Sequence, residues 1–369
     1  MKQARKTKDK LSQNFQNKLL KQFQDLDPVQ IHKNKLDPRL IPILSNIKLA
    51  VPRRFASRDE ILSSIKHPKV IQKHMLFQKT IDSLFETINH SFECLKVEEK
   101  SFLSCPDNNS VPVQVTRPKY KKDLPCVIYF HGGGMAQMSC FDTMYAAWAK
   151  HIAQHGVCVI MVDFRNALWP SKNPIVAPFP AGLNDCVSSV QWVLDNAKDL
   201  CIDTSKVILS GESGGGNLCI ATALKMKQEK RLHLIQGIYA LCPYLLGKWP
   251  LESCPSSKLY NGLFIDLHSN WGRMVYGIDA FNQKNPLAWP GFASSEDLKG
   301  LPEVYISVNE LDPLCDEGVL FYRKLLEAGV KTRCRTVMGT IHAAEIFSIA
   351  CPEISQETAH SIATFCKQR

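Results

Sequence analysis

Short apolar runs alternate with amphipathic runs from about residue 91 to the C-terminus. Eight runs have the length and the Val, Ile and aromatic content of buried strands: 92–97, 111–116, 126–130, 157–162, 206–209, 234–240, 304–308 and 333–337. Helical spacing of apolar residues marks 143–154, 183–196, 217–228, 318–328 and 354–366. This alternation predicts an α/β fold with a mostly parallel eight-stranded sheet and helices on both faces. Because no helix separates the first two strands, we expect them to pair antiparallel.

Two segments depart from this alternation. In the first ninety residues, Leu11, Phe15 and Leu19 form an apolar stripe, and 61–65 and 75–84 predict further amphipathic helix. The second segment, 243–300, separates the sixth and seventh strands and is rich in Trp, Pro, Asn and Ser. Insertions of this length in α/β domains are usually functional and often act as lids. We therefore expect 1–90 to be a helical cap segment and 91–369 a catalytic domain into which 243–300 is inserted as a cap or lid.

The bulk composition narrows the function classes. The chain has 369 residues, of which 45% are hydrophobic and 22% charged, as in soluble globular proteins. The net charge of +10 is concentrated early, but those lysines are interspersed with Gln, Asn and Asp, which favours a solvated face over a nucleic-acid-binding arm. The sequence predicts neither a secretory signal nor a stable insertion into a membrane. Fourteen scattered cysteines without a C-x-x-C pair indicate reduced thiols and a cytoplasmic protein.

The stretch from Gly211 to Gly215 contains a G-x-S-x-G motif centred on Ser213. It lies between the predicted strand 206–209 and the predicted helix 217–228. A strand, a sharp turn and a helix with Ser at the apex form a nucleophile elbow. Side chains two residues before and after the Ser would collide with backbone in so tight a turn, which accounts for the glycines. On its own, the motif also fits an ordinary Gly/Ser turn.

A run of glycines, Gly132 to Gly134, follows His131 directly after the predicted strand 126–130. Glycines let backbone N–H groups approach a ligand closely, and acyl transfer needs such donors for the developing oxyanion. The pattern predicts an oxyanion hole made of the N–H groups of Gly133, Gly134 and Gly214. A phosphate-binding loop or a flexible turn is the alternative, although the chain has no G-x-x-x-x-G-K-[ST] motif. We expect His131 to fix the loop by hydrogen bonds.

A serine nucleophile needs a base, and the base needs an acid that orients it. In α/β folds that carry a nucleophile elbow, the chain order is Ser, then Asp or Glu, then His. The acid is expected after the seventh strand, where Asp312 directly precedes Pro313. A proline at this point suits a loop that holds one conformation. Glu310 and Asp316 are the rival acids, and we expect them to be solvated or to cap a helix.

The base is expected after the eighth strand, and His342 lies five residues beyond it. Of the eleven histidines, only His342 and His360 follow Asp312 in the sequence. His360 falls within the predicted C-terminal helix, where we expect it to face solvent. The predicted catalytic residues are therefore Ser213, Asp312 and His342.

Together these motifs resemble the hormone-sensitive-lipase-like group of α/β hydrolases, which includes carboxylesterases and arylacetamide-deacetylase-like enzymes. The resemblance covers about residue 90 to the end and is carried by 131–134, 211–217, 312–317 and 339–342, with further matches at 163–165, 178–181 and Asp185. It implies the α/β-hydrolase fold with a helical cap, no metal or other cofactor, and a possible homodimer. The chain departs from the family pattern at Gly214, where Ala is usual, and at Phe164, where Tyr is usual. Residues 166–170 and Ala343 also differ.

We expect a serine carboxylesterase that hydrolyses small-to-medium acyl or aryl esters through an acyl-enzyme. Trp249, Phe264, Trp271 and Trp289 suggest a closed aromatic pocket, or else they pack the cap onto the core. An amide deacetylase or a lipase remains open. A non-catalytic small-ligand receptor is the alternative of another class, since the plant gibberellin receptors resemble this family but lack the catalytic His; His342 argues against it. A structural scaffold has no need of four coordinated motifs.

Overall fold

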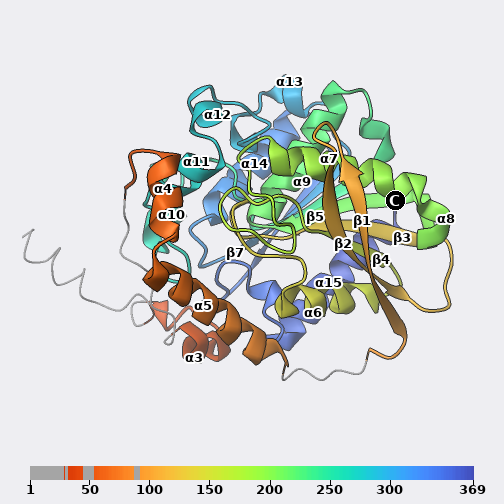
Figure 1. Ribbon diagram of the computed structural model, residues 1–369, viewed down its shortest axis with the longest axis horizontal. Helices are drawn as coiled ribbons and strands as arrows, with labels where there is room; N and C mark the ends of the chain where they lie inside the picture. The colour runs from red at the N-terminus through yellow and green to blue at the C-terminus, as the bar shows by residue number, and fades with distance from the viewer. Residues whose placement is uncertain (1–28, 30–31, 45–53, 87–91) are drawn as a thin grey trace, which may run out of the picture.

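A single eight-stranded sheet organises the chain (Figure 1). The computed structural model describes residues 29, 32–44, 54–86 and 92–369, so the predicted stripe at Leu11, Phe15 and Leu19 lies outside the described residues. All eight predicted strands occur: β1 (Leu95–Ser104), β2 (Asn109–Pro118), β3 (Leu124–Phe130), β4 (Cys158–Val162), β5 (Ile202–Glu212), β6 (Gly237–Leu241), β7 (Glu303–Asn309) and β8 (Thr332–Val337). Their order in the sheet is β1-β2-β4-β3-β5-β6-β7-β8.

The sheet is parallel except at one edge. As expected, β1 pairs antiparallel with β2. The next pair, β2 with β4, is antiparallel as well, and the remaining pairs from β4 to β8 are all parallel. Every residue of β4 and β6 is buried, as parallel strands between two helical layers require. The predicted α/β-hydrolase sheet is confirmed.

Helices cover both faces of the sheet (Figure 1). On one face, α6 (Thr143–Ala153) and α15 (Pro352–Lys367) share a buried apolar cluster with the strands. On the other face, α7 (Ala181–Asp195), α9 (Gly214–Gln228) and α14 (Cys315–Glu327) contribute to a larger cluster. The five predicted helices are these five. Shorter helices are α8 (Ala197–Leu200), η2 (Leu232–Leu234) and η4 (Ala344–Ile346).

The described part of the N-terminal segment forms η1 (Pro38–Leu40), α3 (Ile41–Leu44), α4 (Arg58–Ile65) and α5 (Pro68–Glu86). Helix α4 begins where it does because the Ser57 side chain accepts a hydrogen bond from the Glu60 N–H, and acidic residues fill its first turn. The insertion forms α10 (Ser256–Leu259), α11 (Trp271–Tyr276), α12 (Ile278–Asn282), η3 (Pro290–Phe292) and α13 (Ser295–Leu298).

The N-terminal segment and the insertion contact each other, and Figure 1 shows α4 beside α11. The backbone N–H and C=O of Phe55 both bond to the Asn270 side chain, at 2.9 and 2.7 Å. The Arg58 guanidinium donates to the carbonyl oxygens of Val275 and Ala167. The bonds to Asn270 and Val275 connect the two segments that the sequence predicts to form a cap, and the bond to Ala167 joins the N-terminal segment to the loop after β4.

The N-terminal segment also packs on the loops that follow β7 and β8. The Asp37 N–H donates to the Gly339 carbonyl at 2.8 Å. Leu40 shares a buried cluster with Leu311 and Ile341, each of which directly precedes a predicted catalytic residue. Residues 37–40 therefore support the two loops on which the predicted acid and base lie.

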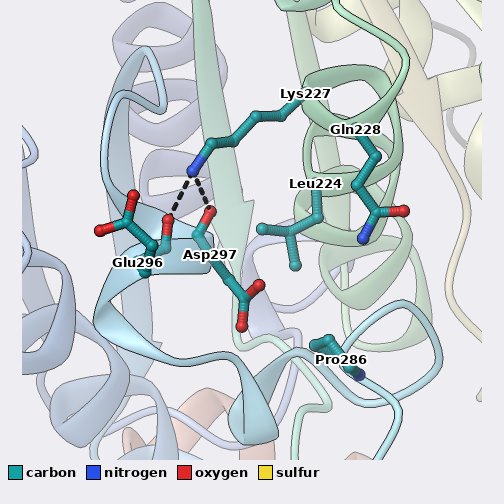
Figure 2. Close-up of a pocket in the computed structure, with 6 residues that line it drawn as sticks. All are labelled: Leu224, Lys227, Gln228, Pro286, Glu296 and Asp297. Atoms are coloured by element: carbon teal, nitrogen blue, oxygen red, sulfur yellow. Dashed lines mark hydrogen bonds between the residues drawn. The ribbon is translucent and has the colours of Figure 1, made fainter.

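A cavity of about 300 Å³ opens at the surface between α9 and α13 (Figure 2). Lys227 crosses it and donates to the carbonyl oxygens of Glu296 and Asp297. Lys227 is thirteen residues along α9 from Gly214, about 20 Å at the helical rise. The cavity is thus remote from Ser213. No helix among the described residues has the length and apolar character to cross a bilayer.

Candidate active site

Ser213 lies at the sharp turn between β5 and α9. Its backbone has φ 55° and ψ −117°, a conformation that costs an ordinary L-residue free energy. A methyl group on Gly211 would lie 2.5 Å from the Phe130 carbonyl oxygen, and one on Gly215 would lie 1.9 Å from the same atom. The expected steric need for glycine on both sides of the Ser is therefore confirmed.

The predicted oxyanion loop leaves β3 and lies against the start of α9. Gly133 and Gly134 have positive φ values of 83° and 64°. A methyl group on Gly214 would lie 2.9 Å from the Gly134 nitrogen and 2.6 Å from the Met135 nitrogen. The structure thus brings Gly214 and the Gly133–Gly134 loop together, and the absence of a side chain at Gly214 lets the two backbones approach this closely.

The Glu212 side chain forms a hydrogen bond with the start of this loop. Its carboxylate accepts hydrogen bonds from the Gly132 N–H and from the hydroxyls of Tyr129 and Tyr145, all at 2.6 Å. Burial raises the pKa of Glu212 to about 7, although the two tyrosine hydroxyls favour the charged form. Sequence reasoning missed Glu212 because it occupies the unspecified position of G-x-S-x-G. The available signal was an acidic residue at the end of an apolar strand.

His342 and Asp312 form a buried pair in the loops after β8 and β7. His342 Nδ1 lies 2.8 Å from Asp312 Oδ2, and the other oxygen of Asp312 accepts from the Leu314 N–H at 2.8 Å. Asp312 is fully buried and His342 is 5% exposed. Burial lowers the pKa of His342, but the Asp312 carboxylate more than offsets this, so the pKa lies above its ordinary value of 6.5.

A shared neighbour places this pair next to Ser213. The Ser213 N–H donates to the Leu241 carbonyl at the end of β6. The next residue, Cys242, has its sulfur within 4.8 Å of a ring nitrogen of His342 and of a carboxylate oxygen of Asp312. The carboxyl ends of β5, β6, β7 and β8 thus bring the three predicted catalytic residues to one place at the edge of the sheet.

The rival residues make other contacts. Glu310 accepts from the Gly339 N–H at 2.8 Å and so supports the loop before His342. Asp316 accepts from the Ser256 N–H at 2.7 Å and holds the start of α10. His360 lies in α15, where it is exposed.

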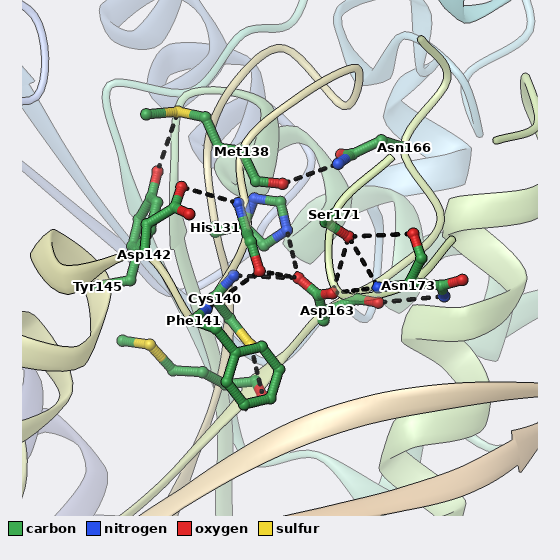
Figure 3. A network of polar contacts seen from close by, with 12 residues as sticks. His131, Met138, Cys140, Phe141, Asp142, Tyr145, Asp163, Asn166, Ser171 and Asn173 are labelled. Atoms are coloured by element: carbon green, nitrogen blue, oxygen red, sulfur yellow. Dashed lines mark hydrogen bonds and ion pairs between the residues drawn. The ribbon is translucent and has the colours of Figure 1, made fainter. Parts of the chain in front are cut away.

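His131 directly precedes the predicted oxyanion loop and lies beside Asp163 (Figure 3). Its ring stacks on Phe164 with 4.2 Å between the centroids, and its Nδ1 lies 3.1 Å from the Gly132 carbonyl oxygen. Burial lowers the pKa of His131, and the nearby Asp163 charge acts in the opposite sense. A neutral, stacked imidazole that bonds to the loop backbone suits a supporting role.

Asp163, after β4, holds two loops together (Figure 3). One oxygen accepts from the Ser139 hydroxyl and the Cys140 N–H, and the other accepts from the Ser171 hydroxyl and the Asn173 N–H. A further bond joins the Asn166 amide to the Met138 carbonyl at 2.8 Å. This network fixes the segment after the glycine run. The motif at 163–165 pointed to Asp163 without revealing these partners.

The four aromatic residues that the sequence singled out in the insertion have different positions. Trp249 and Trp289 are buried and pack with Tyr244, so they belong to the core. Phe264 packs edge-on against Phe347. Trp271 is the one of the four that approaches the predicted oxyanion hole, because its ring would lie 3.7 Å from a methyl group on Gly134.

Comparison with known proteins agrees with this geometry. A family model described as the alpha/beta hydrolase fold matches residues 127–346. An arylesterase of Saccharolobus solfataricus is 31% identical over 240 residues, 64% of this chain and 74% of that protein. Carboxylesterase NlhH of Mycobacterium tuberculosis is 28% identical over 273 residues, 73% of this chain and 82% of that protein.

Solved structures extend the similarity to most of the chain. The structure of esterase Est22 is 51% identical, covers 90% of this chain and 97% of that chain, and superposes with a TM-score of 0.88. Brefeldin A esterase, described as a bacterial homologue of human hormone-sensitive lipase, is 33% identical with a TM-score of 0.76, and the match covers 89% of this chain and 91% of that chain. The chain therefore belongs to the α/β-hydrolase family, in the group related to hormone-sensitive lipase.

Proposed function

We propose that this protein is a serine carboxylesterase that hydrolyses small-to-medium acyl or aryl esters through an acyl-enzyme on Ser213. The observation that carries the proposal is the buried 2.8 Å contact between His342 and Asp312, beside a serine held at a strained turn. A buried His–carboxylate pair next to an activated Ser is the arrangement that acyl transfer requires.

The reaction begins when the Ser213 hydroxyl attacks the ester carbonyl and His342 Nε2 takes its proton. Asp312 holds the other ring nitrogen, so it fixes the tautomer and stabilises the imidazolium. The raised pKa of His342 makes the imidazole a stronger base. His342 next protonates the leaving alcohol, and a water molecule activated by the same base releases the acid. The residues of the chain and water account for every proton transfer, so the proposal includes no metal or other cofactor.

The N–H groups of Gly133, Gly134 and Gly214 are the proposed donors to the oxyanion. The close approach of Gly214 to the loop backbone supports this assignment, because a methyl group on Gly214 would lie 2.9 Å from the Gly134 nitrogen. His131 is assigned to fixing the loop, in keeping with its bond to the Gly132 carbonyl and its stacking on Phe164.

The substrate class follows from the relatives and from the cap. Relatives named arylesterase and carboxylesterase, and a structure of Est22 with p-nitrophenol, favour acyl and aryl esters. We assign 1–90 and 243–300 to a cap over the catalytic domain of 91–369, which the bonds between Phe55 and Asn270 support. Trp271, next to Gly134, is then placed to limit the acyl group.

A cytoplasmic location is part of the same proposal. All fourteen cysteines lie in the described part of the chain and are free thiols, as expected in a reducing compartment. A homodimer also remains a prediction. Size-exclusion chromatography with light scattering measures the oligomeric state directly.

Hydrolysis of p-nitrophenyl esters from acetate to palmitate tests the proposed substrate class. We expect kcat/KM to be highest for the short and medium chains and to fall steeply toward palmitate. A flat profile, or one that favours palmitate, overturns the small-ester assignment. Parallel assays on the matching p-nitroanilides measure the balance between ester and amide hydrolysis.

A further inference from the structure

Cys242 is a buried thiol next to the proposed catalytic pair, and the proposed reaction does not use it. Its sulfur, a ring nitrogen of His342 and a carboxylate oxygen of Asp312 all lie within 4.8 Å of one another. The three residues come from the ends of β6, β8 and β7, and Cys242 is fully buried. A thiol, an imidazole and a carboxylate in one place form a ligand set typical of zinc.

The surroundings of Cys242 carry buried negative charge. The acidic side chains of Asp312, Glu345 and Glu212 lie close enough to the Cys242 thiol to act on it electrostatically. The Glu345 carboxylate is itself fixed, because it accepts hydrogen bonds from Ser307 and Asn309. A divalent cation among these carboxylates would be complemented by their negative charge.

We infer that Cys242, His342 and Asp312 form an inhibitory site for a thiolate-binding divalent cation such as Zn²⁺. The thiol proton is released to solvent on binding, and a sulfur–metal bond replaces the S–H bond. Around a tetrahedral Zn²⁺, ligand atoms lie about 3.5 Å apart, given Zn–S near 2.3 Å and Zn–N near 2.0 Å. His342 Nδ1 and Asp312 Oδ2, now 2.8 Å apart, would exchange their hydrogen bond for two bonds to the cation and move slightly apart, while the Cys242 sulfur, within 4.8 Å of both residues, would move toward them.

Binding at this site removes the proposed base. A cation on His342 Nε2 occupies the atom that receives the Ser213 proton. A cation on Nδ1 displaces the proton toward Nε2, which then has no free lone pair. The inhibitory effect thus rests on the proposed function, whereas the binding of the cation depends only on the three ligands.

The chemistry also predicts selectivity. Mg²⁺ and Ca²⁺ favour six or more oxygen ligands, which this set does not offer, so neither cation is expected to inhibit. Zn²⁺ and Cd²⁺ accept thiolate and imidazole together. Cd²⁺ additionally reports on its ligands, since a cadmium–thiolate bond absorbs in the ultraviolet.

The test compares the wild type with Cys242→Ser and with Cys186→Ser as a matched control, since Cys186 is an equally buried thiol in α7. Each purified protein, freed of metal by a chelator, is titrated with Zn²⁺ while p-nitrophenyl acetate hydrolysis is followed. We expect the Zn²⁺ concentration that half-inhibits Cys242→Ser (the inhibition midpoint) to rise more than about tenfold. Loss of a residue that only supports a metal ligand already weakens metal affinity about tenfold or more. The Cys186→Ser midpoint should match the wild type, and Mg²⁺ should leave all three unaffected.

Equilibrium dialysis with Cd²⁺ and the accompanying absorbance measure binding without relying on activity. The wild type should bind one more Cd²⁺ per chain than Cys242→Ser, with a correspondingly larger thiolate band. Equal Cd²⁺ counts, or equal Zn²⁺ midpoints, overturn the site. A protein with no esterase activity but with the extra Cd²⁺ would contradict the proposed function and leave the site standing. If Cys242→Ser fails to fold, Cys242→Ala replaces it, and a wild type that millimolar Zn²⁺ does not inhibit overturns the inference by itself.

Discussion

The Glu212 carboxylate accepts a hydrogen bond from the Gly132 N–H at 2.6 Å, which ties the residue before Ser213 to the proposed oxyanion loop. Because Glu212 ends β5 and Gly132 follows β3, the contact spans two neighbouring strands. The nucleophile turn and the oxyanion loop are therefore held in register by one buried side chain. The protonation state of Glu212 therefore affects both the nucleophile turn and the proposed oxyanion loop.

Glu212→Gln is expected to change how stability depends on pH. The pKa of Glu212 is raised to about 7 from an ordinary value of 4.5, so the folded protein holds a proton that the unfolded chain releases between these values. Its contribution to the free energy of unfolding is fully present below pH 4.5 and is lost as the pH rises through 7, by on the order of 3 kcal/mol. Urea unfolding across this range measures the free energy of unfolding of the wild type and of the variant. The wild-type value minus the variant value should fall as the pH rises. A constant difference contradicts the assignment.

Gly214→Ala is expected to lower kcat although the family usually has Ala there. The added methyl would lie 2.6 Å from the Met135 nitrogen, and backbone cannot move aside as a flexible side chain can. We expect kcat for p-nitrophenyl acetate to fall by about 10²- to 10³-fold, as for the loss of an oxyanion donor. Gly300→Ala is the control for a strained glycine remote from the site, since Gly300 has a φ of +82° and a methyl there meets open space. Unchanged kcat in Gly214→Ala would contradict the proposed loop position.

Asp312→Asn should reduce kcat by about 10⁴-fold, because the amide no longer fixes the His342 tautomer. The acid limb of the wild-type kcat/KM profile should lie above pH 6.5, where His342 with its raised pKa gains a proton. Removing the carboxylate should move the residual limb to lower pH. The rival acids are the controls: Glu310→Gln and Asp316→Asn should each cost less than about tenfold. A larger loss in either would reassign the acid.

Trp271→Ala should widen the acyl specificity. Because its ring lies close to Gly134, removing it opens space beside the proposed oxyanion hole. The ratio of kcat/KM for the octanoate ester to that for the acetate ester should rise several-fold. Trp249→Phe alters a buried core aromatic instead and should lower the thermal midpoint while it leaves the ratio unchanged. An unchanged ratio in Trp271→Ala argues against a role in specificity.

Local patterns predicted all eight strands and the five main helices, because apolar runs and helical spacing report burial directly. They did not predict that β2 also pairs antiparallel with β4, since that pairing joins segments forty residues apart. The motif order predicted Ser213, Asp312 and His342, and the structure brings these residues to one edge of the sheet. The partners of Glu212 and the nearness of Cys242 to His342 depend on which strands are neighbours, which local patterns do not contain.

The environment of the aromatic residues in 243–300 likewise could not be predicted from local patterns. The sequence left open whether Trp249, Phe264, Trp271 and Trp289 line a pocket or pack on the core. Trp249 and Trp289 prove to be core residues, while Trp271 approaches Gly134. Aromatic character does not distinguish these positions, because both environments favour large apolar rings.

The most direct test of the central claim is the turnover of p-nitrophenyl acetate by Ser213→Ala, measured beside Ser210→Ala. Ser210 is a buried serine three residues earlier on β5, where its hydroxyl bonds to the Tyr239 carbonyl, so it controls for the loss of a hydroxyl. We predict that kcat of Ser213→Ala falls at least about 10³-fold and that this variant is no longer labelled by a fluorophosphonate. Ser210→Ala should keep both its turnover and its labelling. Turnover by Ser213→Ala within tenfold of the wild type, or undiminished labelling, would contradict the assignment of Ser213 as the nucleophile.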